Sequence, residues 1–194
     1  PYQKNGYNWL NQMNDLGFGA CLADDMGLGK TIQVISFLEK MYETNKESHV
    51  LLIVPASLLG NWSKEIDKFA PRMTYHILHG KTNILDEDCF ATITTYGMAL
   101  RMECLQERVW DCLILDEAQA IKNPGTKQTR AIKKIPSQMR IAMTGTPIEN
   151  DLSNLWSLFD FLNKGLLGSA TDFKNYTKKV QAYPEYMTKL KMMV

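Results

Sequence analysis

What this sequence lacks excludes several classes of protein. No apolar run approaches the roughly 20 residues that a membrane-spanning helix needs, and there is no internal repeat or low-complexity segment. The polar and aromatic N-terminus carries no secretory signal pattern. Without a long apolar run we expect no membrane partner. Because the chain has no initiating Met and stops abruptly at Val194, we expect a fragment of a longer protein.

Cysteine and histidine are also scarce. The four cysteines show no C-x-x-C spacing, and three of them lie in or beside apolar runs. We therefore expect buried, reduced thiols in an intracellular protein (cytoplasmic, nucleoid or nuclear), rather than zinc ligands or disulfides. His76 and His79 are three residues apart in a strand-like run, so they are expected to face opposite sides of a sheet and not to share a metal.

What is present is typical of a globular domain. The chain has 194 residues, of which 45% are apolar and 22% charged, which suits one domain with a core and a small appendage. The net charge of +1 conceals two basic stretches: residues 163–194 hold six Lys and two acids, and residues 122–134 hold five basic residues and no acid. Such stretches are most often solvated helix faces, although beside a nucleotide site they also suit a phosphate backbone.

Apolar runs and helical periods alternate along the chain. Several runs are apolar throughout, which is typical of strands covered on both faces. The alternation predicts an α/β fold with a mainly parallel sheet and helices on both faces, in which ligands bind beyond the carboxyl ends of the strands. The predicted strands are 20–23, 50–55, 73–79, 89–95, 112–116 and 140–144, and the predicted helices lie within 1–17 and at 31–44, 57–69, 97–107, 126–135 and 151–162.

The strongest motif is the stretch 20–31, which runs from an apolar strand through a glycine loop into a helix. Gly27 and Gly29 allow the backbone to turn sharply and approach an anion, and the helix N-terminus adds partial positive charge. Lys30 is expected to reach the β- and γ-phosphates, and the Thr31 hydroxyl to bind Mg²⁺. The alternative, a plain glycine turn between two core elements, does not explain Lys-Thr at the start of the helix.

Polar residues also follow two later strands. Asp116 and Glu117 end an apolar run, where Asp116 is expected to hold Mg²⁺ and Glu117 to orient the attacking water of a nucleotide hydrolase. An acid pair that merely caps a helix is the alternative. Thr144, Gly145 and Thr146 follow another strand, where the two hydroxyls could sense the γ-phosphate, unless the segment is an ordinary turn.

Six blocks in this order, covering most of residues 1–169, resemble the first RecA-like lobe of a Swi/Snf-type superfamily 2 helicase-like ATPase, a P-loop nucleoside triphosphatase. Asp24 stands where the strict P-loop pattern has Gly, and Gln119 stands where many relatives have His; both are familiar variants in this group. The blocks are Pro1-Tyr-Gln3 with Trp9-Leu10, Asp24-Asp-Met-Gly-Leu-Gly-Lys-Thr-Ile-Gln33, Leu52-Ile-Val-Pro-Ala-Ser57 with Asn61-Trp62, Thr94-Thr-Tyr96, Asp116-Glu-Ala-Gln119 with Ile121-Lys-Asn-Pro124, and Thr144-Gly-Thr-Pro-Ile-Glu-Asn150 with Leu155-Trp156.

The resemblance implies further roles. It implies that Gln3 forms hydrogen bonds to the edge of the adenine base and so selects ATP. It also implies that the loop ending in Lys30 and Thr31 binds the phosphates of ATP. It implies DNA-backbone contacts without sequence readout, although the Thr-Thr-Tyr run also suits an ordinary strand. Trp62 and Trp156 are expected to be packing residues. The loop residues are Asp25, Met26, Gly27, Leu28 and Gly29, and the expected DNA contacts are Pro55, Ala56, Ser57, Thr94, Thr95, Tyr96, Lys122, Asn123 and Lys127.

The resemblance also implies an organisation and a function. Residues 1–162 would form the lobe and residues 163–194 the start of a helical protrusion, while a second lobe of the parent chain supplies arginines worth ~10³–10⁵ in rate. The parent would hydrolyse ATP with Mg²⁺ and move along double-stranded DNA, and this lobe alone would turn ATP over poorly. Two alternatives stay open: a strand-separating helicase acting on RNA or DNA, and a catalytically inactive scaffold that binds nucleic acid or partners.

Overall fold

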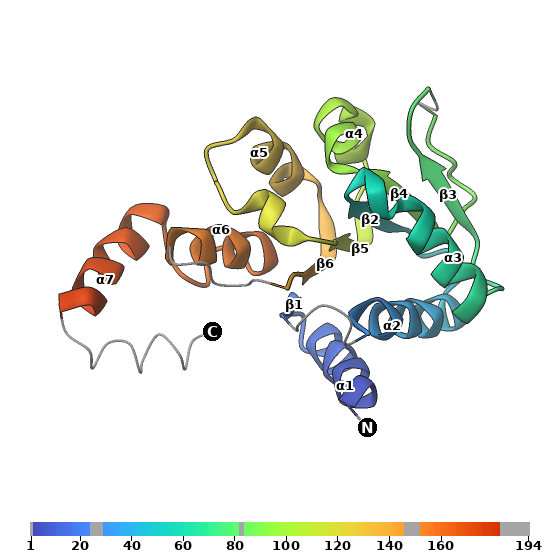
Figure 1. Cartoon of the computed structure of the whole chain (residues 1–194), viewed down its shortest axis with the longest axis horizontal. Coiled ribbons are helices and arrows are strands. Elements are labelled where there is room, and N and C mark those ends of the chain that lie inside the picture. The colour runs from blue at the N-terminus through green and yellow to red at the C-terminus, as the bar shows by residue number, and fades with distance from the viewer. Residues whose placement is uncertain (1, 24–28, 82–83, 146–151, 183–194) are drawn as a thin grey trace.

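The computed structural model describes residues 2–23, 29–81, 84–145 and 152–182, and these form a six-stranded sheet flanked by helices (Figure 1). The strands are β1 (Ala20–Leu22), β2 (Val50–Val54), β3 (Tyr75–Leu78), β4 (Ala91–Thr95), β5 (Trp110–Leu115) and β6 (Ser137–Met143). The helices are α1 (Tyr2–Asp15), α2 (Lys30–Thr44), α3 (Leu59–Phe69), α4 (Tyr96–Arg101), α5 (Lys127–Lys134), α6 (Leu152–Leu162) and α7 (Ala170–Ala182), with short 3₁₀ turns η1 (Ala56–Leu58), η2 (Glu103–Gln106) and η3 (Ala118–Ile121).

The sheet has the strand order β1-β6-β5-β2-β4-β3, and its strand pairs are parallel. The predicted α/β fold with a parallel sheet is therefore confirmed. The register places Leu22 beside Met143 and Ile53 beside Leu115, so neighbouring strands end at nearly the same level. Since all strands run in one direction, the segments that follow them meet at one edge of the sheet.

Helices cover both faces of the sheet, as the fully apolar strands predicted. All five residues of β2 are buried. Val50 and Leu52 pack with residues of α1, α2 and α3, whereas Leu51 and Ile53 pack with residues of α4, α5 and α6. This alternation follows from the two-residue period of a strand. We call these two sides of the sheet the α1–α3 face and the α4–α6 face; Figure 1 labels the helices of each.

Two predicted helices are shorter than expected. The predicted helix 57–69 begins as the 3₁₀ turn η1, and α3 starts only at Leu59. The predicted helix 97–107 is interrupted at Met102, whose ψ of 95° is extended, so α4 ends there and η2 follows. The apolar spacing on which these predictions rested does not detect a local change of the backbone from helical to extended.

The prediction of buried thiols holds for one cysteine. Cys112 is fully buried in β5, but Cys21, Cys89 and Cys104 are partly exposed, so the prediction is wrong for these three. Cys21 lies on β1, which is an edge strand of the sheet. All four cysteines are free thiols. The described residues contain no group of three or more His, Cys, Asp or Glu side chains arranged to hold a metal ion.

Helix α7 packs on α6 through a small apolar cluster of its own. Leu155, Leu167 and Phe173 are buried together there, apart from the two clusters that cover the sheet. The indole of Trp156 donates to the Gly168 carbonyl (3.0 Å), which confirms that Trp156 is a packing residue. A domain boundary at residue 162 stays a prediction. Among the helices that the structure describes, none combines the length and apolar character needed to cross a membrane.

Candidate functional site

Most of the predicted site segments lie at one edge of the sheet. The strands β1, β6, β5, β2 and β4 are consecutive neighbours and end at this edge. Thr144, directly after β6, donates its backbone N–H to the Leu22 carbonyl at the end of β1 (3.1 Å), and Asp116, directly after β5, donates its N–H to the Ile53 carbonyl near the end of β2 (2.9 Å). The structure thus brings the end of β1 and the residues directly after β5 and β6 to the same edge of the sheet.

The helix that follows the glycine loop begins at Lys30. Gly29 precedes it with φ of +79°, a left-handed conformation that glycine adopts without strain, and offers no side chain to cap the helix. A Cβ at Gly29 would meet the amide end of the Gln3 side chain, so Gln3 lies directly beside this glycine. Thr31 is half-buried in the first turn of α2. An uncapped helix N-terminus of this kind attracts anions.

The remaining loop residues cannot be placed. Asp25, Met26, Gly27 and Leu28 lie outside the described residues, and so does Thr146. Their predicted roles therefore stay predictions.

Asp116 is a buried carboxylate, with 8% of its surface exposed. Oδ2 accepts a hydrogen bond from Nε1 of Trp62 (2.7 Å), and Oδ1 accepts one from the backbone N–H of Glu117 (2.9 Å). Burial raises the pKa of Asp116, while these two hydrogen bonds and the positive charge of Lys30 act in the opposite direction. Lys30 and Asp116 are therefore close enough to interact electrostatically. A carboxylate oriented in this way, with a threonine hydroxyl and substrate phosphates, matches the donors that Mg²⁺ takes in nucleotide sites.

Glu117 has an unusual backbone conformation. Its φ of 50° and ψ of 55° are left-handed, and no other non-glycine residue in the described part of the chain has a positive φ. Such strain often marks functional sites. The hydroxyl of Tyr96 donates to the Asp116 carbonyl (2.6 Å) and so fixes the peptide that precedes Glu117. Burial, and then the charges of Asp116 and Glu117, raise the pKa of Tyr96 well above its ordinary value, so the hydroxyl remains a donor.

A chain of hydrogen bonds joins Glu117 to the segment after β6. Nε2 of Gln119 donates to Oε2 of Glu117 (2.6 Å), and Oε1 of Gln119 accepts from Oγ1 of Thr144 (3.0 Å). The amide of Gln119 therefore links Glu117, the predicted water-orienting acid, to the predicted coupling residue Thr144. Gly145 follows at half exposure. The sequence identifies Gln119 only as a familiar variant of a position where many relatives have His, and does not predict this connecting role.

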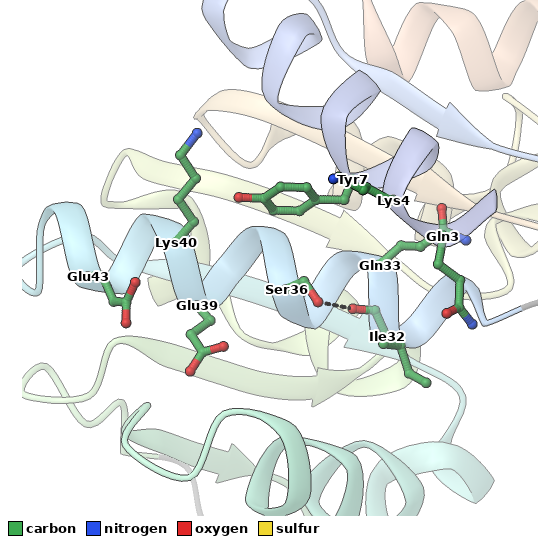
Figure 2. Close-up of a pocket in the computed structure, with 9 residues that line it drawn as sticks. All are labelled: Gln3, Lys4, Tyr7, Ile32, Gln33, Ser36, Glu39, Lys40 and Glu43. Carbon is green, nitrogen blue, oxygen red and sulfur yellow. Dashed lines mark hydrogen bonds between the residues drawn. The ribbon is translucent and has the colours of Figure 1, made fainter. Parts of the chain in front are cut away.

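A pocket of about 440 Å³ lies between α1 and α2 and extends along α2 from Ile32 to Glu43. Gln3 and Gln33 line one end of it, Tyr7 lies along α2, and Glu43 is at the other end (Figure 2). Gln33 is 2% exposed, and its Nε2 has no hydrogen-bond partner among the described residues. A Cβ at Gly6 would overlap Oε1 of Gln33, so the glycine admits this amide. Buried, unpaired amides are rare, so this one, on a residue that lines the pocket, marks the pocket as a candidate ligand site.

The predicted nucleic-acid residues fall into two groups. Ala56, Ser57, Lys122, Asn123 and Lys127 are exposed, and Pro55 is half-buried. Thr94, Thr95 and Tyr96 are buried. Their side-chain oxygens form hydrogen bonds within the lobe. The Thr94 hydroxyl donates to the Leu78 carbonyl, and the Thr95 hydroxyl accepts from the backbone N–H of Met98. The Tyr96 hydroxyl donates to the backbone carbonyl of Asp116.

Trp62 is the most informative residue that sequence reasoning missed. It is 1% exposed, which confirms the predicted packing role, but its indole also reaches Asp116 from α3. No spacing pattern signals this contact, since the two residues are 54 positions apart. The same holds for Gln33, whose place in a helical pattern predicts only a polar helix position.

The fold and the site together define the class of this protein. A parallel sheet, an uncapped helix N-terminus that starts with Lys-Thr, and a strand-tip carboxylate near that lysine are features of a RecA-like P-loop nucleotide-binding lobe. The chain belongs to the SNF2-related domain family, whose model matches residues 2–193.

Relatives in several organisms agree with this assignment. The chain is 46% identical over 191 residues to the "Putative ATP-dependent helicase/translocase YwqA" of Bacillus subtilis, covering 93% of this chain and 21% of that protein. It is 42% identical over 189 residues to the human "DNA excision repair protein ERCC-6-like", covering 89% of this chain and 15% of that protein. The chain thus spans about a fifth or less of the length of these relatives.

Solved structures give the same result for the fold. The "Sulfolobus solfataricus SWI2/SNF2 ATPase core in complex with dsDNA" superposes with a TM-score of 0.94 at 45% identity, covering all of this chain and 42% of that one. The structure titled "Sulfolobus solfataricus SWI2/SNF2 ATPase core domain" gives 0.90 at 44% identity, with 41% of that chain covered. The predicted family and the RecA-like fold are confirmed.

Proposed function

We propose that this chain is the ATP-binding lobe of an ATP-dependent double-stranded DNA translocase, completed by a second RecA-like lobe of its parent protein. The observation that carries the proposal is the placement of Lys30 at the start of α2 and of the buried carboxylate of Asp116 directly after β5, near enough for the charge of Lys30 to act on the pKa of Asp116. A cation for the phosphates and an acid for their metal ion are the two charges that phosphoryl transfer needs most.

The residues present fit ATP with Mg²⁺. Lys30 and the N-terminus of α2 bind the β- and γ-phosphates, together with the loop that ends at Gly29. Thr31 and Asp116 hold Mg²⁺, which supplies neutralisation of the phosphate charge when it is bound. Glu117 orients the attacking water, and the amide of Gln119 holds Glu117 in place. Phosphoryl transfer relies mainly on such positioning and electrostatics.

The adenine base is assigned to the pocket between α1 and α2. Its volume of about 440 Å³ is in the range of small-ligand sites. Gln3 lies there beside Gly29 and so next to the phosphate-binding end of α2, and Gln33 adds a second amide with an unused donor. Both amides suit the donor and acceptor pattern of an adenine edge.

Double-stranded DNA is the proposed partner, because a structural relative of this chain is titled as a complex with dsDNA. The proposed backbone contacts are the half-buried Pro55 and the exposed Ala56 and Ser57 after β2, with the exposed residues Lys122, Asn123 and Lys127. Such contacts fix register without reading sequence. The buried side chains of Thr94, Thr95 and Tyr96 are proposed to support that surface from within, and Thr144, Gly145 and Thr146 to pass on the nucleotide state.

The parent's second lobe supplies what this lobe lacks. We propose that residues 1–162 form the lobe, that residues 163–194 begin an extension from it, and that catalytic arginines reach the nucleotide from the second lobe. The separate cluster of Leu155, Leu167 and Phe173 supports an extension that packs independently of the sheet. The isolated lobe is expected to bind nucleotide weakly and to hydrolyse it poorly, even with DNA.

A nucleotide titration tests the proposal. A fluorescent ATP analogue is titrated into the full-length parent and its Lys30→Ala variant, with and without duplex DNA, and hydrolysis is followed in parallel. We expect binding and DNA-stimulated hydrolysis in the parent and the loss of both in Lys30→Ala. If the variant retained full function, the lobe would be a nucleic-acid-binding scaffold, and efficient strand displacement by the parent would instead identify a strand-separating helicase.

A further inference from the structure

The indole of Trp62 links the segment after β2 to the acid of the nucleotide site. Trp62 lies on α3, a few residues after Pro55, Ala56 and Ser57. It is 1% exposed, and its Nε1 donates to Oδ2 of Asp116 at 2.7 Å. A hydrogen bond to a charged acceptor at this distance and depth is among the stronger kinds in proteins. Any rotation of α3 that accompanies a contact at its N-terminus therefore moves a donor of Asp116.

The segment after β4 reaches the same residue from the opposite face of the sheet. Tyr96 is the first residue of α4, and its hydroxyl donates to the Asp116 carbonyl at 2.6 Å. Trp62 packs in the cluster on the α1–α3 face and Tyr96 in the cluster on the α4–α6 face. Asp116 is thus held through its side chain by α3 and through its backbone by α4.

The orientation of the carboxylate depends on these contacts. Oδ1 is fixed by the N–H of Glu117 (2.9 Å), and the peptide between Asp116 and Glu117 is itself held by Tyr96. Oδ2 accepts from Trp62, so each oxygen of the Asp116 carboxylate accepts one hydrogen bond. Each oxygen then keeps a lone pair with which it can bind a metal ion. Donors of this kind around a metal-binding carboxylate set its orientation and its affinity for the ion.

We propose that Trp62 and Tyr96 are positioning residues for Asp116. They transmit DNA contacts of the segment after β2, and movements of the buried β4–α4 segment that supports it, to the Mg²⁺ site. The proposal rests on the function proposed above and adds the route by which DNA acts on the nucleotide. Coupling of this kind is reciprocal: DNA changes the affinity for Mg²⁺-nucleotide, and Mg²⁺-nucleotide changes the affinity for DNA by the same factor.

The Trp62→Phe variant of the full-length parent tests the proposal. Phenylalanine keeps most of the apolar volume and removes the N–H. The matched control is Trp110→Phe, because Trp110 is equally buried (1% exposed) but donates to the Leu105 carbonyl, away from the site. The readout is the apparent affinity for Mg²⁺, from binding of a fluorescent ATP analogue at increasing Mg²⁺, with and without duplex DNA. Thermal unfolding is measured for each variant.

We expect Trp62→Phe to weaken the apparent Mg²⁺ affinity by about 10-fold, in line with the loss of a partner of a metal ligand, and to reduce the effect of DNA on it. Trp110→Phe should lower the unfolding temperature and leave the Mg²⁺ dependence as in the wild type. Tyr96→Phe should reduce the change in apparent Mg²⁺ affinity that duplex DNA causes. If Trp62→Phe does not fold, the same measurement on Tyr96→Phe tests the proposal.

Equal Mg²⁺ dependence in the Trp62→Phe and Trp110→Phe variants, or an unchanged DNA effect in Tyr96→Phe, overturns this inference while the proposed function stands. A wild-type parent that binds nucleotide without any dependence on Mg²⁺ or Lys30 would overturn the proposed function instead. In an Asp116→Ala background, Trp62→Phe should have no further effect on Mg²⁺-dependent binding, because Trp62 acts through Asp116.

Discussion

Each face of the sheet buries a tryptophan whose indole N–H is bonded, but the acceptors differ. On the α1–α3 face, Trp62 donates to the carboxylate of Asp116, whereas on the α4–α6 face Trp110 donates to the backbone carbonyl of Leu105. A backbone carbonyl in this position needs a partner only because it is buried. A buried carboxylate is costly and is retained where its charge is used. Trp62 and Trp110 are therefore equally buried, but Trp62 orients a carboxylate of the candidate site and Trp110 satisfies a buried backbone carbonyl.

Ion pairs show a similar difference between the two faces. Lys133 and Asp160 on the α4–α6 face lie 2.8 Å apart, with side chains that are 16% and 20% exposed. Arg72 and Glu43, at the outer surface beside α2 and α3, are also 2.8 Å apart, but their side chains are 74% and 56% exposed. The first pair belongs to the scaffold, together with Arg140, which donates to the carbonyls of Ile135 and Phe161. The polar groups that react gather at the strand tips instead.

The largest effect is expected on ATP hydrolysis, at Glu117 in the candidate nucleotide site. Glu117→Gln in the full-length parent removes the charge that is proposed to orient the attacking water, and we expect ATP hydrolysis to fall by about 10³-fold, or roughly 4 kcal/mol in the barrier. Nucleotide binding and the unfolding temperature should change little, since Glu117 is half-exposed. Steady-state hydrolysis and thermal unfolding measure the two. A loss of stability equal to that of a core variant would show that Glu117 belongs to the scaffold.

The next-largest effect is expected on stability, at the partly buried ion pair between Lys133 and Asp160. Asp160→Ala leaves the ammonium of Lys133 partly buried without its carboxylate, and we expect a loss of about 2 kcal/mol in the free energy of unfolding, less than for a fully buried pair. Chemical denaturation of the full-length parent, with a signal that reports on the unfolding of this lobe, measures this loss of free energy. The matched control is the double variant Lys133→Met with Asp160→Leu, which should be nearly neutral because no charge is left unpaired.

The same variant has a pH signature. Burial lowers the pKa of Lys133, and the hydrogen bond and charge of Asp160 oppose that shift. Without Asp160 the folded pKa falls further below the unfolded one, so the unfolded chain binds more protons between the two values and stability rises with pH across that window. The deficit of Asp160→Ala should therefore shrink as the pH rises toward the ordinary lysine pKa. A deficit independent of pH would contradict this explanation.

A smaller effect is expected where the two segments after β5 and β6 meet. Gln119→Ala removes the amide between Glu117 and Thr144, and we expect hydrolysis to fall by about 10-fold, since one hydrogen bond to a charged group is lost. Gln119→Glu serves as a control of similar size that places a like charge beside Glu117. If Gln119→Ala hydrolysed ATP at the wild-type rate, the hydrogen bonds seen here would have no part in orienting Glu117.

The smallest effect is expected at the surface. Arg72→Ala breaks the exposed ion pair with Glu43, and we expect less than about 0.5 kcal/mol of stability to be lost. Denaturation at low and high salt measures both the loss and its screening. A cost as large as that of Asp160→Ala would remove the distinction between exposed and buried pairs on which this comparison depends.

The sequence predicted the elements well and the contacts between them poorly. All six strands, the helix that starts at Lys30 and the acids after β5 lie where the sequence predicted, because strand and helix periods are local properties. The family resemblance added the RecA-like fold. The DNA contacts that the resemblance implies stay predictions, and the structure adds that the side chains of Thr94 and Tyr96 are buried and bonded within the lobe.

The sequence by itself determined which residues carry charge and which can turn, pack or bind phosphate: a Lys-Thr pair after glycines, an acid pair after an apolar run, and alternating strands and helices. Only the tertiary structure decided that Trp62 reaches Asp116, that Gln119 joins Glu117 to Thr144, and that the amide of Gln33 is left unpaired beside a pocket. The physical reason is that periodicity is set by the backbone of one segment, whereas a hydrogen bond between distant residues depends on how whole helices pack on the sheet.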